Sequence, residues 1–299
     1  MTKVLCVCLL FGSVLNSALA LQPPVAKVHE GEHWVWFAQR NQFEEHGDEI
    51  EQFYGYADRA LGYLIKVWGL KPPGQKYALL VWQKTGGGFA TGDIAEVRPL
   101  TGKPTPGIGV SYDAFFNVAH GIKGYWGYVL ITHEMVNLFT AQTVSGGWPV
   151  DWWANHDSPF PLMTAVQIEY ALVPEVAVRH GKELSNPLGQ MFLQLKEQYG
   201  WALFRRAFAA AREDGINWER IGQNPSALRT NYVCAYLQLC APEDLASYLT
   251  GVVPNFDAKM VTDILKARQR WQSLPDGDPR HADLRGAFLR GNTAQNNEE

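Results

Sequence analysis

A histidine and a glutamate stand side by side, His133 and Glu134, inside an otherwise apolar segment from Val129 to Phe139. Burying an imidazole and a carboxylate among apolar side chains is costly unless both groups have partners. Zinc hydrolases solve this problem because the histidine binds the metal and the glutamate takes a proton from water. The pair therefore indicates a candidate site for metal-dependent hydrolysis, with Glu134 as the general base.

The residues after this pair have the spacing of a zinc-peptidase motif. Asn137 lies one helical turn after His133, which places both side chains on one side of a helix. Eighteen residues then separate Asn137 from His156, which ends the segment Trp153-Ala-Asn-His156. The pattern resembles the aminopeptidase-like and enhancin-like members of the zincin superfamily, whose motif is H-E-x-x-H followed after the same interval by a glutamate in a W-x-x-E context.

This resemblance implies a zinc ion held by His133 and His156, with Asn137 or Asp157 completing the ligand shell. Asn137 replaces a histidine of the family motif, and a neutral amide is a poor ligand for zinc. Three alternatives stay open. A carboxylate such as Asp157 completes the shell, or the site binds metal weakly or binds another metal, or the protein is a non-catalytic binding protein with a zincin fold.

Simpler structural roles compete with the metal site. His133 and Glu134 could be a buried pair that bonds loop backbone, and His156 with Asp157 could cap the next helix. Glu169 and Glu175 on that helix are reserve carboxylate ligands, although a solvated helix face is the favoured prediction for both.

A glycosidase is the second enzyme hypothesis, because such enzymes use two facing carboxylates and no metal. Glu134 would be one acid, and Asp151 or Asp157 the other. The chain has 11 tryptophans, and three of them near these acids could stack on sugar rings: Trp148, Trp152 and Trp153.

The pattern of apolar residues predicts an α+β fold. A helix over 43–68 and the helix of the motif, over 125–143, accompany short strands at 34–38, 77–82 and 107–112, and helices occupy most of the remaining chain. The resemblance implies a zincin-like domain with a mixed-sheet N-terminal lobe over about 21–145, a helical C-terminal lobe over about 146–275, and the active helix between them. The glycine-rich stretch 86–92 is the predicted edge strand on which an extended substrate would pair.

The two ends of the chain carry further predictions. Residues 1–20 read as a signal peptide cleaved after Ala20, which makes the protein secreted or periplasmic, and residues 276–299 read as a disordered tail. Cys234 and Cys240 remain after cleavage, and their disulfide is an open question because an unbroken helix would hold them too far apart. The formal net charge of −4, without a basic block, disfavours nucleic acid as a partner. No later segment is long enough to span a membrane. The resemblance and the glycosidase alternative together predict a peptide, a glycopeptide or a polysaccharide as the substrate.

Overall fold

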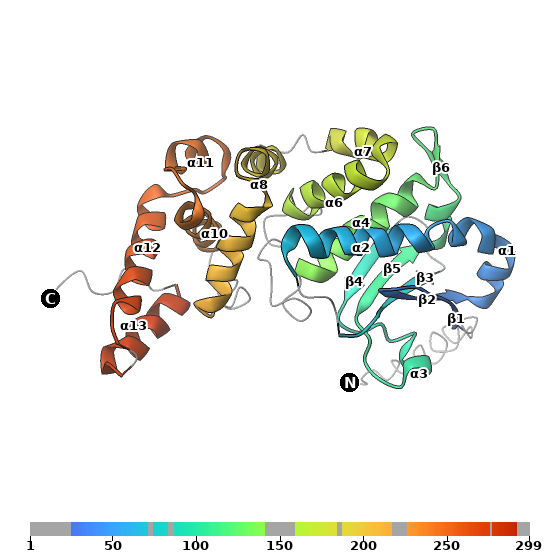
Figure 1. Ribbon diagram of the computed structural model, residues 1–299, viewed down its shortest axis with the longest axis horizontal. Helices are drawn as coiled ribbons and strands as arrows, with labels where there is room; N and C mark the ends of the chain where they lie inside the picture. Colours follow the sequence, from blue (N-terminus) through green and yellow to red (C-terminus); the bar gives the residue numbers. More distant parts are fainter. Residues whose placement is uncertain are drawn as a thin grey trace, which may run out of the picture.

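The N-terminal part of the chain is built on a five-stranded mixed sheet (Figure 1). The computed structural model describes residues 25–70, 74–82, 87–140, 159–183, 187–216, 226–275 and 277–291. The strands are β1 (Val25–Glu30), β2 (Trp34–Gln39), β3 (Tyr77–Trp82), β4 (Gly88–Thr91) and β5 (Gly107–Ser111). Their order in space is β1-β2-β3-β5-β4, in which β2, β3 and β5 run parallel while β1 and β4 are antiparallel to their neighbours.

Helices cover the two faces of this sheet unequally. They are α1 (Arg40–Glu51), α2 (Tyr54–Trp68), α3 (Arg98–Thr101) and α4 (Tyr125–Thr140). Alternate side chains of a strand point to opposite faces, so Trp36 and Leu79 join the main core with α2 and α4. The neighbouring residues Phe37 and Leu80 face the other way, into a small cluster with Val97 just before α3.

The described residues after α4 are mostly helical, as predicted. Its helices are α6 (Pro159–Leu172), α7 (Pro174–His180), α8 (Pro187–Glu213), α10 (Ser226–Cys240), α11 (Ala246–Val252), α12 (Ala258–Gln272) and α13 (Pro279–Leu289). Helix α6 packs on both α4 and α8, so it joins the sheet-bearing part to the later helices (Figure 1). The α+β class is therefore confirmed, and the predicted boundary between the lobes, at 145/146, lies outside the described residues.

Several helical segments are interrupted in the structure. The helix predicted over 43–68 consists of α1 and α2, and α2 ends at Gly69, whose φ of 65° suits a glycine C-cap. Pro174 separates α6 from α7 because proline has no N–H to continue the helix. Gly200, with φ 65° and ψ −178°, bends α8 in its middle.

The C-terminal region differs from its prediction. A disordered tail was predicted from residue 276, but Pro279–Leu289 forms α13, which packs on α12 and buries Phe288 to 1% exposure. The proposed signal peptide, residues 1–20, lies outside the described residues. Among those that are described, no helix is both long and apolar enough to cross a membrane.

The two cysteines of α10 are free thiols. Cys234 and Cys240 stand on one continuous helix, where six residues of rise, about 9 Å, prevent a bond between them. Burial raises the pKa of the Cys234 thiol well above its usual value, so this group stays protonated.

Candidate functional site

Helix α4 carries the His133–Glu134 pair against the sheet, where it packs on β4 and β5. The helix begins at Tyr125, as predicted, and its predicted end at Thr143 lies outside the described residues. Its flanking apolar residues, among them Met135 and Val136, are fully buried in the main core. The helix is therefore a rigid support for its polar residues.

The carboxylate of Glu134 lies against the backbone of β4. A Cβ atom at Gly88 would stand 2.5 Å from Glu134 Cγ and 2.8 Å from Glu134 Oε1, so only glycine leaves room for this side chain. Strand β4 is one of the two edge strands of the sheet, as predicted for the stretch 86–92, of which residues 87–92 are described. The pairing of a substrate with this strand stays a prediction. The Glu134 side chain is 8% exposed, because it lies between helix α4 and strand β4.

Asn137 belongs to the same cluster. Its amide Nδ2 donates a hydrogen bond to Glu134 Oε2 over 3.3 Å. His133 directly precedes Glu134 and is partly buried. The structure thus brings Glu134 and Asn137 together beside His133, whereas His156 and Asp157 lie outside the described residues.

Zinc fits these residues only in part. The imidazole of His133 is a donor that zinc accepts readily, but a structural or catalytic site needs at least three protein ligands. Among the described residues, no group of three or more His, Cys, Asp and Glu side chains could hold a metal ion. Completion of a zinc shell therefore depends on His156 and Asp157. The second acid Asp151 and the tryptophans Trp148, Trp152 and Trp153 also lie outside the described residues.

Glu169 is fully buried, so the predicted solvated position is wrong for this residue. Its Oε1 accepts a hydrogen bond from Thr132 Oγ1 at 2.6 Å, and its Oε2 lies 2.8 Å from His180 Nδ1. A buried carboxylate needs such partners, and both of its oxygens are engaged. Glu169 therefore ties α4, α6 and α7 together, while Glu175 is exposed as predicted.

Burial also raises the pKa of a neighbouring tyrosine, Tyr56. Tyr56 on α2 is 1% exposed, and burial raises its pKa well above the usual value, with a further contribution from the Glu169 carboxylate. The phenol therefore stays neutral, and this polar cluster beneath α4 is a structural contact between helices.

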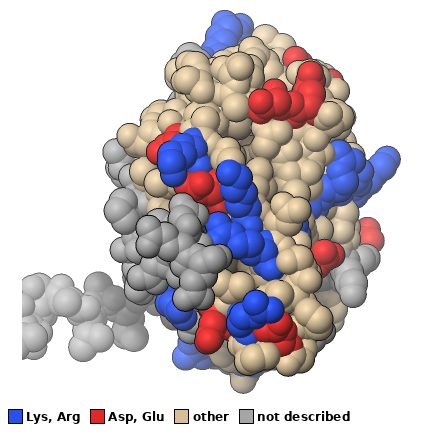
Figure 2. All heavy atoms as spheres, turned by 90° about the vertical axis from the view of Figure 1, so that its left-hand side faces the viewer, with Lys and Arg blue, Asp and Glu red and all other residues tan. Residues whose placement is uncertain are grey.

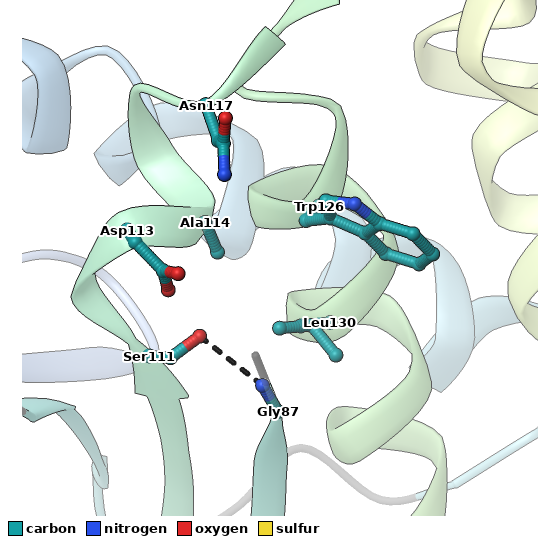
Figure 3. Close-up of a pocket in the computed structure, with 7 residues that line it drawn as sticks. All are labelled: Gly87, Ser111, Asp113, Ala114, Asn117, Trp126 and Leu130. Atoms are coloured by element: carbon teal, nitrogen blue, oxygen red, sulfur yellow. Dashed lines mark hydrogen bonds between the residues drawn. The ribbon is translucent and has the colours of Figure 1, made fainter. Parts of the chain in front are cut away.

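A pocket of about 340 Å³ opens beside the same helix (Figure 3). Its lining comes from the start of β4, the end of β5, the short helix η1 (Tyr112–Phe115) that follows, and the first half of α4. The lining residues are Gly87, Ser111, Asp113, Ala114, Asn117, Trp126 and Leu130. Ser111 Oγ accepts a hydrogen bond from the backbone N–H of Gly87 over 3.3 Å, which fixes the start of β4 at the pocket wall.

None of the motifs described above indicates this pocket. Two signals were available: Trp126 and Leu130 precede His133 by seven and three residues, which places them on its side of the helix. Asp113 lies two residues after the end of the buried strand β5, and polar residues at strand ends commonly face ligand sites in α/β sheets. The sequence does not indicate that the short helix η1 packs against α4.

A second hollow lies on the far helices, between α10 and α12, and Lys266 and Arg268 contribute to its lining. Figure 2 shows Lys and Arg side chains in a band across this side of the molecule, with acidic side chains beside them. Arg268 Nη2 donates to Asp214 Oδ1 over 3.2 Å, and Tyr236 donates to Oδ2 over 2.6 Å. The Arg268 guanidinium is therefore paired with Asp214, and this contact helps to hold α10 and α12 together.

Comparisons with family models, with curated proteins and with solved structures found no match for this chain. The functional interpretation therefore depends on the arrangement of the residues themselves.

Proposed function

We propose that this protein is a secreted zinc-dependent hydrolase of peptides or glycopeptides, with a zincin-like arrangement in which Glu134 is the general base. The observation that carries the proposal is the contact of the Glu134 carboxylate with Gly88 on the edge strand β4. An extended peptide adds to a sheet by pairing with an edge strand. A substrate paired with β4 would present its carbonyl groups close to this carboxylate.

The two oxygens of Glu134 have different surroundings. Oε2 accepts the hydrogen bond from Asn137, and Oε1 lies 2.8 Å from the position that a Cβ atom would take at Gly88. The amide therefore orients the carboxylate with one oxygen toward the strand. In this position Glu134 can accept a proton from a water molecule and later pass it to the leaving amine.

His133 would hold the metal with His156, and Asp157 or Asn137 would complete the shell. When bound, zinc supplies a Lewis acid that polarises a carbonyl group and lowers the pKa of water. The secretion proposal rests on residues 1–20, whose apolar run ends in Ala18-Leu19-Ala20.

Glu134→Gln tests the mechanism. The substitution keeps the size of the side chain and an acceptor for Asn137, but it removes the base. We expect hydrolysis of a fluorogenic peptide library to fall by about 10²–10⁴-fold, with an unchanged melting temperature and zinc content. The matched control is Glu175→Gln, at an exposed position on α7, which should keep full activity. Full activity in Glu134→Gln would reject the mechanism.

The hydrogen bond from Asn137 to Glu134 also favours a second candidate, a non-catalytic binding protein of similar architecture. In that case an amide occupies the position of a ligand histidine and holds the carboxylate in place. Zinc analysis separates the two candidates: about one equivalent, lost in His133→Ala but kept in His281→Ala on α13, supports the hydrolase. An intact protein without zinc or hydrolysis supports the binding protein, and polysaccharide binding would then favour the carbohydrate alternative.

A further inference from the structure

Helix α4 is held on two sides by different kinds of contact. On one side it packs on β4 and β5, and Glu134 reaches Gly88 there. On another side it packs on α6, and Thr132 reaches Glu169 there. Thr132 and Glu134 are two residues apart, which places their side chains about 200° apart around the helix axis. A shift of α4 at Thr132 therefore moves Glu134 relative to strand β4.

The contact at Thr132 has a defined direction. Its hydroxyl has one hydrogen, and its oxygen Oγ1 lies 2.6 Å from Glu169 Oε1, which is the length of a hydrogen bond from a hydroxyl to a carboxylate. The carbonyl oxygens of Tyr128 and Val129 on the same helix are farther from Oγ1, at 2.9 and 3.1 Å. The threonine therefore donates across to α6 and not back along its own helix.

The carboxylate of Glu169 is itself held in place. It is fully buried, and its Oε2 lies 2.8 Å from Nδ1 of His180 on α7. The apolar side chains of Met135 and Val136 on α4 are also fully buried, but apolar contacts have no preferred direction and allow small rotations of a helix. A buried hydrogen bond has a narrow range of length and angle, and leaving one of its groups unpaired is costly. The bond from Thr132 therefore sets the rotation of α4 more sharply than apolar packing does.

We propose that Thr132 and Glu169 are positioning residues for Glu134, because their hydrogen bond fixes the rotation of α4 at which the Glu134 carboxylate meets Gly88 on the edge strand. The inference rests on the proposed function, in which Glu134 is the general base. A general base must lie within hydrogen-bond reach of the proton that it takes, so a displacement that leaves the fold intact still lowers the rate. Thr132 and Glu169 act without touching the substrate, since both are fully buried.

Two substitutions at one position separate the hydroxyl from the bulk of the side chain. Thr132→Val keeps the size and branching but removes the hydroxyl, whereas Thr132→Ser keeps the hydroxyl. We expect Thr132→Val to lower kcat for a fluorogenic peptide about tenfold while KM stays within about twofold of the parent value, because a small misplacement of a reacting group slows the chemical step. Thr132→Ser should recover most of the parent kcat.

The matched control is Thr164→Val on α6. Thr164 is fully buried like Thr132, but its hydroxyl has no hydrogen-bond partner in the described part of the chain. Removing this hydroxyl should therefore leave kcat and KM at their parent values.

The amide resonance of Gly88 reports the position of Glu134 without turnover. It can be observed in the full mature protein labelled with nitrogen-15 glycine, and it is identified by its loss in Gly88→Ala. The resonance should move in Thr132→Val and stay in place in Thr132→Ser and Thr164→Val, because a contact that only stabilises the helices has no effect at β4. An unmoved resonance in folded Thr132→Val, or an equal movement in Thr164→Val, would overturn the inference.

A second variant protects the test against misfolding of Thr132→Val. Glu169→Gln keeps the size of the side chain and an acceptor for Thr132, but it removes the charge that strengthens the bond. It should move the Gly88 resonance in the same direction by a smaller amount. An unmoved resonance in folded Glu169→Gln would also contradict the positioning role.

The outcomes also separate this inference from the proposed function. Should the native protein hydrolyse no peptide while the Gly88 resonance moves in Thr132→Val and not in Thr164→Val, the positioning of the Glu134 side chain stands and the hydrolase proposal fails. Should Glu134→Gln abolish hydrolysis while Thr132→Val keeps the parent kcat and an unmoved Gly88 resonance, the hydrolase stands and the positioning role fails.

Discussion

Asn137 sets the limit on the metal chemistry that the motif helix can support. Its amide donates to Glu134, and it lies one turn from His133 at the position where the zincin motif has a second histidine. An amide that is already engaged with a carboxylate contributes little to a zinc shell. The proposed zinc chemistry therefore depends strongly on the side chain at position 137.

Asn137→His should raise zinc affinity by at least about tenfold, because an imidazole at this position joins His133 on one side of α4. Equilibrium competition with a chromogenic chelator would measure the change. Asn137→Ala is the matched control: it removes the amide without adding a ligand, so its zinc affinity should not rise. An unchanged affinity in Asn137→His would mean that position 137 does not face the metal and that the family alignment is wrong.

Glu169 shows why single residues are hard to place from the sequence. Its partners Thr132 and His180 stand 37 and 11 residues away, and nothing in the spacing indicates that three helices meet there. A glutamate without a known partner is normally solvated, and that expectation failed here. The pair His133–Glu134 was easier to recognise because its apolar neighbours already indicated burial.

At the scale of elements, continuous apolar runs and breaker residues were reliable signals. The strand β3 was predicted with its observed bounds, Tyr77–Trp82, and the central helix with its observed start. Strand β1 was missed, since it depends on pairing with β2, which the sequence does not state. Candidate site residues on α4 could be predicted, whereas Asp113 and its pocket depend on how distant elements fold together.

Strand β4 supplies a prediction about the site. Gly88→Ala would put a methyl group 2.5 Å from Glu134 Cγ, so the glutamate side chain must move. Because small displacements of catalytic groups lower rates by up to about 10²-fold, we expect peptide hydrolysis to fall at least tenfold with only a modest loss of stability. Kinetic assays and thermal melts would measure the two effects.

The control for this change is Gly74→Ala, where an added Cβ meets no atom within 4 Å. This variant should keep both its rate and its melting temperature. A Gly88→Ala protein with the parent rate would show that Glu134 can move without consequence, which contradicts the proposal that it is a positioned base.

At the scale of the whole molecule, the folded region extends further toward the C-terminus than the composition indicates. The segment Pro279–Leu289 carries four charged or titratable side chains, but Leu284 and Phe288 are four residues apart and so lie on one side of α13. Phe288 packs against Tyr232 of α10 and Trp271 of α12, with ring centroids 5.6 and 6.0 Å away. The last helix therefore closes the core formed by α10 and α12.

Phe288→Ala tests this arrangement. Removing a ring that is 1% exposed should lower the free energy of unfolding by about 3–5 kcal/mol, because both the apolar burial and the packing around the ring are lost. Denaturation in urea, followed by circular dichroism, would measure the change. Leu100→Ala is the control, since this leucine is 52% exposed and its loss should change stability by no more than about 0.5 kcal/mol. If the region after residue 276 were a disordered tail, the two variants would be equally stable; a large difference between them requires that α13 is part of the folded core.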